Sequence, residues 1–210
     1  MSSRHLVPKV AILDPDLTAS LPQRLTAATG IDALSHCIEG YLSKRDLPLG
    51  KSIALDGIAR VARSLRGATV ERDPHSRTDM MLAAYAGGAS IGMGLGPAHA
   101  FAITCSDQGF HHGILSGIGM VATLNATTAH VPDRAAEIAA AFGVQQPLSD
   151  AIAALMTNLG LPTTLAGLGY TVTDADAMGQ AAHRSHFNAS APFHPTSEEY
   201  ASMITASARR

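Results

Sequence analysis

The amino-acid sequence predicts an all-α domain of many helices, with one short strand near the N-terminus. Apolar side chains recur every three or four residues along most of the 210-residue chain, which is the spacing of helices with one buried face. Aromatic residues make up only 4% of the chain, so smaller side chains, alanine prominent among them, supply much of the apolar surface. Alanine allows helices to approach closely, and the composition therefore favours packed helices.

The strand is predicted at residues 9–13, a short apolar run that Asp14 and Pro15 close. Such a run suits a strand that is buried on both faces. No later segment offers a clear partner, and a lone buried strand cannot satisfy its own backbone N–H and C=O groups. We therefore expect this strand to belong at the junction with a sheet that the chain itself does not supply.

The first three helices are predicted at residues 25–43, 49–66 and 73–91. Apolar residues such as Ile31 and Leu34 fall at helical spacing in the first segment, and the second repeats the pattern. A proline stands in the first turn of the third helix, where its missing N–H costs nothing.

Prolines and capping residues mark the starts of most later helices. Asp174 precedes one of these helices, and Ser197 opens the last. The later helices are predicted at 97–104, 113–129, 132–142, 147–160, 173–186 and from 197 onwards.

Charge and hydropathy exclude several classes of function. The net charge is −2 and no run of lysine or arginine occurs, which gives no support for nucleic-acid binding. No apolar stretch reaches the ~18 residues of a membrane span, and the first residues lack the apolar core of a signal peptide. Cys37 and Cys105 are too few for a disulfide framework, and we expect both to be buried thiols in a cytoplasmic protein.

Asp32 and His36 are the first candidates for chemistry. They lie four residues apart on a predicted helix, so both side chains project from one face and could hold a divalent metal. Glu39 lies on the same polar stripe and could orient His36. The alternative is an ordinary exposed polar face, but the apolar neighbours Ile31 and Ile38 argue against it.

Three further histidines stand near the starts of two later helices. His99 follows a glycine-rich run, and the pair His111 and His112 follows after a short interval. Each could be a buried hydrogen-bonded or capping histidine. Together with Asp32 and His36 they would form a mixed oxygen and nitrogen donor set, which suits Fe²⁺ or Zn²⁺ better than Ca²⁺ or Mg²⁺.

The glycine run at residues 92–96 does not fit a dinucleotide site. Such a site needs a preceding strand and an acidic residue about 20 positions later. Here a predicted helix precedes the run, so we expect the glycines to allow a tight turn and close helix packing.

Two segments resemble the iron-containing alcohol dehydrogenases. The first comprises residues 11–14 (AILD), 21–22 (LP) and 27–39 (AATGIDALSHCIE), and the second comprises 94–100 (GLGPAHA) with 112–113 (HG). The resemblance covers essentially the whole chain, but only about half of the family's length.

The resemblance implies that Asp32, His36, His99 and His112 hold the metal, with Fe²⁺ expected and Zn²⁺ as the alternative. It implies that residues 21–210 are the helical metal-binding domain and that residues 1–20 are a strand and junction to an absent nucleotide-binding domain. NAD(P) would bind only with that N-terminal domain. The implied activity is hydride transfer between a primary alcohol or aldehyde and nicotinamide. The expected partners are a small-molecule alcohol or aldehyde and either further copies of the chain or the N-terminal half, with no membrane and no nucleic acid.

The chain departs from the family pattern at two places. The family usually has another histidine four residues after the third ligand, where this chain has Ile103. The interval from His99 to His112 is also one residue shorter than usual. These differences put the proton relay and the substrate preference in doubt, and no catalytic residue besides the metal ligands is assigned.

Two other functions remain open from the sequence. One is a truncated or excised helical domain that binds metal without activity of its own. The other is a metal-dependent hydrolase, which a second metal cluster or an adjacent His–Asp pair would favour.

Overall fold

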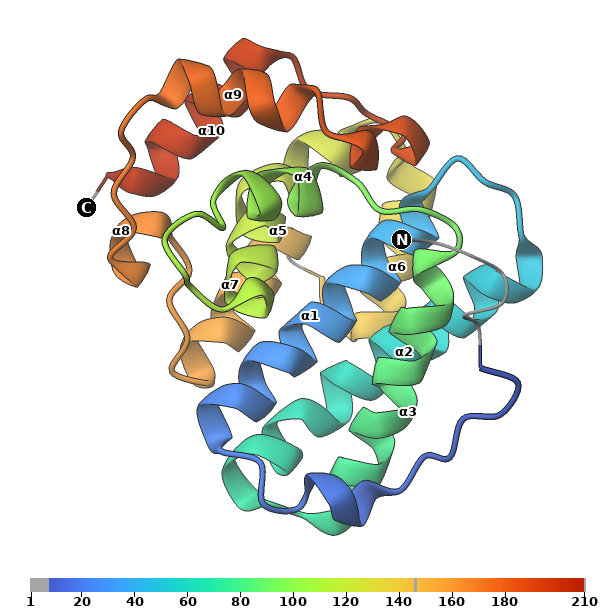
Figure 1. Cartoon of the computed structure of the whole chain (residues 1–210). Helices are drawn as coiled ribbons and strands as arrows, with labels where there is room; N and C mark the ends of the chain where they lie inside the picture. Colours follow the sequence, from blue (N-terminus) through green and yellow to red (C-terminus); the bar gives the residue numbers. More distant parts are fainter. Residues whose placement is uncertain (1–7, 146, 210) are drawn as a thin grey trace.

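The computed structural model describes residues 8–145 and 147–209 and is built from helices (Figure 1). Within these residues there are ten α-helices and no β-strand. The α-helices are α1 (Gln23–Leu42), α2 (Pro48–Arg66), α3 (Pro74–Ile91), α4 (Pro97–Thr104), α5 (His112–Ala129), α6 (Pro132–Phe142), α7 (Leu148–Asn158), α8 (Leu165–Leu168), α9 (Ala175–His183) and α10 (Ser197–Ala208). The prediction of an all-helical domain is therefore confirmed.

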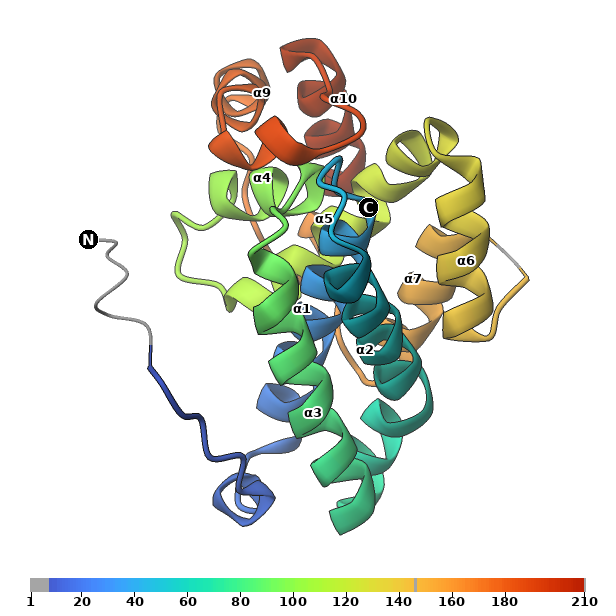
Figure 2. The ribbon, with the colours of Figure 1, turned by 90° about the vertical axis from the view of Figure 1, so that its right-hand side faces the viewer.

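The predicted strand at residues 9–13 is wrong. This segment is irregular and runs beside the helical body without joining it, as Figure 2 shows. Val10 and Ile12 are 77% and 88% exposed, and Leu13, on the opposite face of such a strand, is 41% exposed, so the apolar run is not buried on either face. A strand needs a neighbouring strand to pair its backbone groups, and none lies among the described residues.

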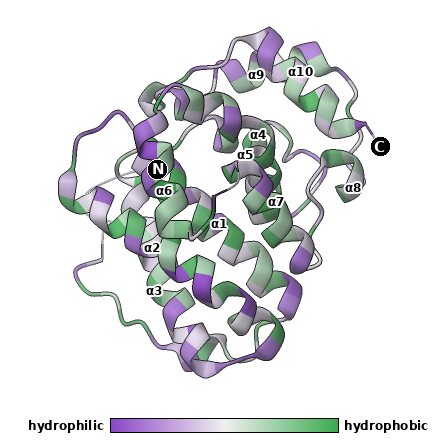
Figure 3. Cartoon of the chain, turned by 180° about the vertical axis from the view of Figure 1, so that it is seen from behind, coloured by the Kyte–Doolittle hydropathy of each residue, from purple (hydrophilic) through white to green (hydrophobic). Residues whose placement is uncertain are grey.

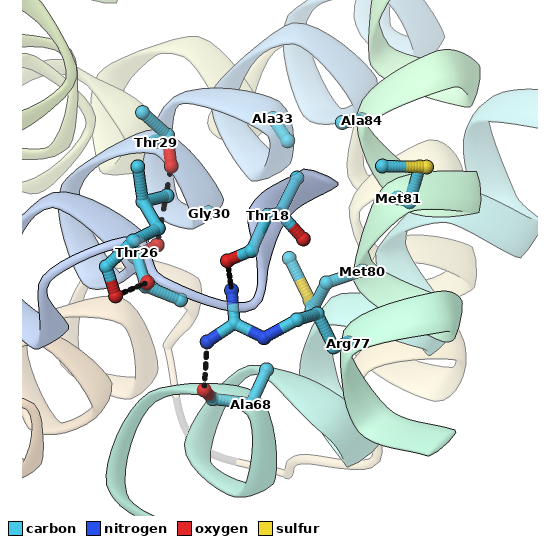
Figure 4. Close-up of a pocket in the computed structure, with 11 residues that line it drawn as sticks. Thr18, Thr26, Thr29, Gly30, Ala33, Ala68, Arg77, Met80, Met81 and Ala84 are labelled. Atoms are coloured by element: carbon cyan, nitrogen blue, oxygen red, sulfur yellow. Dashed lines mark hydrogen bonds between the residues drawn. The ribbon is translucent and has the colours of Figure 1, made fainter. Parts of the chain in front are cut away.

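The segment is fixed to the helical body at its end, where Pro15–Thr18 form a 3₁₀ turn. The buried Arg77 of α3 donates hydrogen bonds to the carbonyl oxygens of Thr18 and Ala68, as Figure 4 shows. Beside this contact lies a mostly apolar cavity of about 150 Å³ between the turn, α1 and α3. None of the four candidate metal ligands lines this cavity.

Local sequence signals explain where many of the helices begin. Prolines occupy the first turns of α2, α3, α4 and α6, where a proline needs no hydrogen-bond donor and already has a helical φ. At α10 the Thr196 hydroxyl and the Glu199 carboxylate cap each other's backbone N–H groups. Gly143 ends α6 with a φ of 76°, which favours glycine.

Helix α1 is the centre of the fold and packs against α2, α3 and α5. Most of its residues are buried, including Ile31 and Leu34, which are fully enclosed. Because α1 is covered on several sides, Ser35 and Glu39 are buried and Asp32 and His36 are partly buried, although residues of its first turns such as Arg24 remain exposed.

Helix α4 lies between α5 on one side and α9 on the other, and α10 packs against α9 (Figure 1). It contributes Ala100 to a small buried cluster with Ala182 and Tyr200. Ala98 and Ala102 on the same short helix are also buried. These small side chains allow α4 to fit between its neighbours.

Several details were not predicted from the sequence, among them the 3₁₀ turns at Pro15–Thr18 and His186–Ser190. A π-helical turn at Gly67–Glu71 extends α2, the one-turn helix α8 follows α7, and α9 ends at His183, short of residue 186.

Most helices carry both polar and apolar residues (Figure 3). Among the described residues no helix combines the length and the apolar character that a membrane span requires.

Candidate metal centre

Helix α1 places Asp32 and His36 one turn apart. The carboxylate oxygen Oδ2 of Asp32 is 3.9 Å from Nε2 of His36, and both side chains are about four-fifths buried. The helical spacing predicted that these two side chains share a face, and the structure has them side by side.

Helix α4 brings His99 to the same place. Its Nε2 is 3.9 Å from Oδ1 of Asp32, and its ring stacks on that of His36 with centroids 4.8 Å apart. His99 is only 1% exposed. Asp32, His36 and His99 offer three ligand atoms that all lie within 4.8 Å of one another.

Helix α5 begins with His112, which adjoins this group without being one of the three residues whose ligand atoms all lie within 4.8 Å of one another. The Nε2 atom of His112 is 3.7 Å from Oδ1 of Asp32. Gly113 lets α5 approach α1 this closely, because a Cβ at this position would lie 2.2 Å from the carbonyl oxygen of Ala28. Of the four residues that the resemblance singled out, three therefore form one compact group and the fourth lies beside it, next to Asp32.

His111 has a different role from its neighbour. It is the N-cap of α5, and its Nδ1 accepts a hydrogen bond from the backbone N–H of Gly113 at 3.1 Å. The sequence alone left open which of the two histidines faces the cluster.

Glu39 lies beside a different histidine from the one that we expected. The sequence suggested His36, but the Glu39 carboxylate lies 2.7 Å from Nδ1 of His99 and accepts a hydrogen bond from the N–H of Ala98, also at 2.7 Å. The physical reason is that the N-terminus of α4 packs over α1 next to Glu39, a contact that spacing along α1 cannot reveal.

The donors have the chemistry that a divalent ion requires. Asp32 Oδ1 and His99 Nε2 are buried and have no hydrogen-bond partner among the described residues. A buried polar atom left unpaired costs about 1–3 kcal/mol. An ion between the donors would satisfy both atoms. The carboxylate oxygens of Asp32 lie 3.7–3.9 Å from Nε2 of the three histidines. These distances slightly exceed the roughly 3.3–3.4 Å between ligand atoms that tetrahedral zinc bonds of about 2.0–2.1 Å imply.

The electrostatics also suit a cation. Burial lowers the pKa of His36 and of His112, which favours the neutral imidazole that metals bind. Burial also acts to lower the pKa of His99, but the hydrogen bond and charge of Glu39, with the charge of Asp32, outweigh it and raise that pKa. The pocket around His99 thus favours positive charge.

The arrangement of helices is that of known dehydrogenases. The structure superposes on 1,3-propanediol oxidoreductase with a TM-score of 0.90 and 29% sequence identity, covering 96% of this chain and 56% of that one. It superposes equally well, with a TM-score of 0.90 and 27% identity, on sulfoacetaldehyde reductase from Bifidobacterium kashiwanohense in complex with NAD+, covering 98% of this chain and 56% of that one.

Residues 26–208 match the model of the Fe-containing alcohol dehydrogenase family, C-terminal region. The chain therefore belongs to the iron-containing alcohol dehydrogenase family. It is 34% identical to 4-hydroxybutyrate dehydrogenase of Cupriavidus necator, covering 96% of this chain and 56% of that protein. It is 30% identical to lactaldehyde reductase of Escherichia coli K12, covering 85% and 50%. The chain spans about half the length of these relatives.

Proposed function

We propose that this chain carries the metal centre of an NAD(P)-dependent alcohol dehydrogenase, which transfers hydride between a primary alcohol or aldehyde and nicotinamide. The observation that carries this proposal is the convergence of Asp32, His36, His99 and His112, with two of their donor atoms buried and unpaired. Membership of the iron-containing alcohol dehydrogenase family supports the same conclusion.

The four residues would hold Fe²⁺, with Zn²⁺ as the alternative. One carboxylate and three imidazoles are donors of intermediate hardness, which suit either ion. When bound, such an ion supplies a Lewis acid that lowers the pKa of an alcohol hydroxyl and stabilises negative charge on its oxygen. The chain's own part is to fix the donors and to limit water: Phe187 covers one side of the His99 ring, with centroids 5.7 Å apart.

We assign NAD(P) binding to a nucleotide-binding domain other than residues 21–210, and residues 1–20 to the junction with it. The glycine run at 92–96 lies between α3 and α4, and pyrophosphate sites of the dinucleotide type follow a strand instead. The sulfoacetaldehyde reductase that shares this fold is about twice as long and was solved with NAD+. Exposed apolar side chains on α3 and α4, such as Tyr85 and Ile103, are available for contact with such a domain or with a second copy.

The substrate is proposed to be a small alcohol or aldehyde. The names of the relatives include 4-hydroxybutyrate dehydrogenase and lactaldehyde reductase, whose substrates are small hydroxy or carbonyl compounds. Ile103 lies one turn after His99 and is 48% exposed, so it offers an apolar side chain where the resemblance leads one to expect a histidine. An isoleucine cannot carry a proton, so the proposed reaction would not use this position as a proton relay.

Metal analysis of the anaerobically purified chain tests the proposal. We expect about one Fe²⁺ or Zn²⁺ per chain, and loss of that metal in Asp32→Ala. A protein that takes up neither ion under these conditions would contradict the proposed function. Metal uptake without turnover, even when a nucleotide-binding domain of a relative is supplied, would favour the alternative of a metal-binding domain without activity.

A further inference from the structure

The carboxylate of Glu39 is buried and lies outside the group of candidate ligands. Its side chain is 5% exposed, and its two oxygens face the first turn of α4. One oxygen accepts from the N–H of Ala98 at 2.7 Å. The other lies 2.7 Å from Nδ1 of His99 and 3.4 Å from the N–H of the same residue. A carboxylate is buried at this depth only when hydrogen bonds replace the water that it has lost.

We propose that Glu39 is a positioning residue of the metal centre, which keeps the proton of His99 on Nδ1 and so presents the Nε2 lone pair to the ion. This inference rests on the proposed metal site and deepens it, because it names the residue that sets the form of one ligand. No metal-binding role for Glu39 itself is implied.

The two nitrogens of the imidazole ring cannot both bind a metal while the ring is neutral. A neutral histidine carries one proton, and the nitrogen without it is the one that can bind a metal. An ionised carboxylate only accepts hydrogen bonds, so the nitrogen beside it must carry the proton. Glu39 therefore places the proton on Nδ1 of His99 and leaves Nε2 unprotonated, toward Asp32.

The carboxylate can act in this way because it is held in place from the side of α4. Backbone N–H groups at the start of a helix point outward and attract a negative charge. Gly96 precedes that turn, and a Cβ there would lie 2.8 Å from Oε1 of Glu39. Glycine at 96 thus leaves the space that the carboxylate occupies. On its other faces the His99 ring is packed against His36 and Phe187, which keeps it from turning away.

Glu39→Gln tests the inference, since glutamine has nearly the same shape. If the amide oxygen accepts from Ala98, the amide NH₂ faces Nδ1 of His99 and moves the ring proton to Nε2, where it competes with the metal. Loss of a partner of this kind typically lowers metal affinity 10–100-fold, and we expect a drop of that size for Zn²⁺ measured by competition with a chromophoric chelator. Gly96→Ala, which keeps the charge but displaces the carboxylate, should also weaken binding.

Asp79→Asn is the matched control. It makes the same change of carboxylate to amide in a group that pairs with Arg60 and Arg63 of α2, and we expect its Zn²⁺ affinity to stay within about twofold of the wild type. A second readout is the ¹⁵N NMR spectrum of the Zn²⁺-loaded wild-type chain, in which His99 should show a protonated Nδ1 and a metal-bound Nε2. This measurement decides the matter even if Glu39→Gln does not fold.

The outcomes separate the two proposals. A wild-type chain that binds no metal contradicts the proposed function, and the inference falls with it. If Glu39→Gln binds Zn²⁺ as tightly as the wild-type chain does, the metal site stands and the role of Glu39 is overturned. The same holds if the wild-type chain binds the ion through Nδ1 of His99.

Discussion

Replacing His111 and His112 separately by alanine should produce opposite effects, although the two residues are neighbours. His112 directs Nε2 toward Asp32, 3.7 Å away, and its side chain is 40% exposed. His111 instead caps α5 through its Nδ1, which accepts from the N–H of Gly113. One histidine therefore serves the candidate metal centre and the other serves the helix.

The structure sets the size of each effect. Loss of an N-cap costs about 0.5–2 kcal/mol, so His111→Ala should lower the thermal midpoint of the metal-free chain by a few degrees, because 1 kcal/mol corresponds to about 2–4 °C at this size. His112→Ala removes a half-exposed side chain whose hydrogen-bond contact is with Ser116 at 3.3 Å, and its stability should change by less than about 0.5 kcal/mol. Loss of one of four ligands should lower metal affinity by more than the roughly 10–100-fold typical of an outer partner.

Both effects can be measured on the same samples. Thermal unfolding followed by circular dichroism in a chelator gives the stability, and Zn²⁺ competition titration gives the affinity. We expect His111→Ala to lose thermal stability and keep its affinity for Zn²⁺. His112→Ala should keep its thermal stability and lose affinity for Zn²⁺. If His111→Ala loses the metal while His112→Ala retains it, the register assigned to the short loop before α5 is wrong.

Three further results are expected. Zn²⁺ at about 100 times its dissociation constant should stabilise the chain by about 2.7 kcal/mol. A thermal midpoint that does not rise would contradict metal binding by the folded chain. Gly119→Ala should lower the urea midpoint of unfolding, since its Cβ would lie 2.4 Å from the carbonyl oxygen of Ala98. The control Gly88→Ala meets no atom within 4 Å and should be neutral or stabilising by up to about 1 kcal/mol. Equal midpoints for the two variants would refute the close approach of α5 to α4 at Gly119. Burial raises the pKa of both Cys37 and Cys105 from 9.0 to about 12, so thiol reagents at pH 8 should label them only in denaturant. Because the unfolded thiols lose their protons above about pH 9 and the buried thiols do not, the same shift lowers the free energy of unfolding as the pH rises from 9 toward 12. Rapid labelling of the native chain would show that the thiols are accessible.

Much of the fold could be predicted because local signals suffice for helices. The boundaries of α4 at 97–104 follow from a proline at the start and an apolar turn pattern. The strand at 9–13 failed because an apolar run does not reveal what will cover it, and here Val10 and Ile12 face solvent. The π-helical turn at 67–71 gave no signal, because a single turn of five residues is too short to show an apolar period of its own.

Residue spacing could group only those candidate ligands that lie on the same helix. Asp32 and His36 share a face of α1 because they are four residues apart. The same logic assigned Glu39 to His36, but the partner of Glu39 is His99, which α4 delivers from 60 residues further along the chain. The selection of His112 came from the resemblance, and its binding to a metal stays a prediction.

The alanines of α4 carry a consequence for how sequences of this kind can diverge. Ala98, Ala100 and Ala102 are at most 2% exposed, so a larger side chain at these positions would have to displace its neighbours. We expect exchange for valine or leucine to shift α4, and His99 with it, relative to Asp32, although every donor atom is still in the sequence. A relative with all four ligands but bulky residues at these three positions is therefore expected to bind the metal less well.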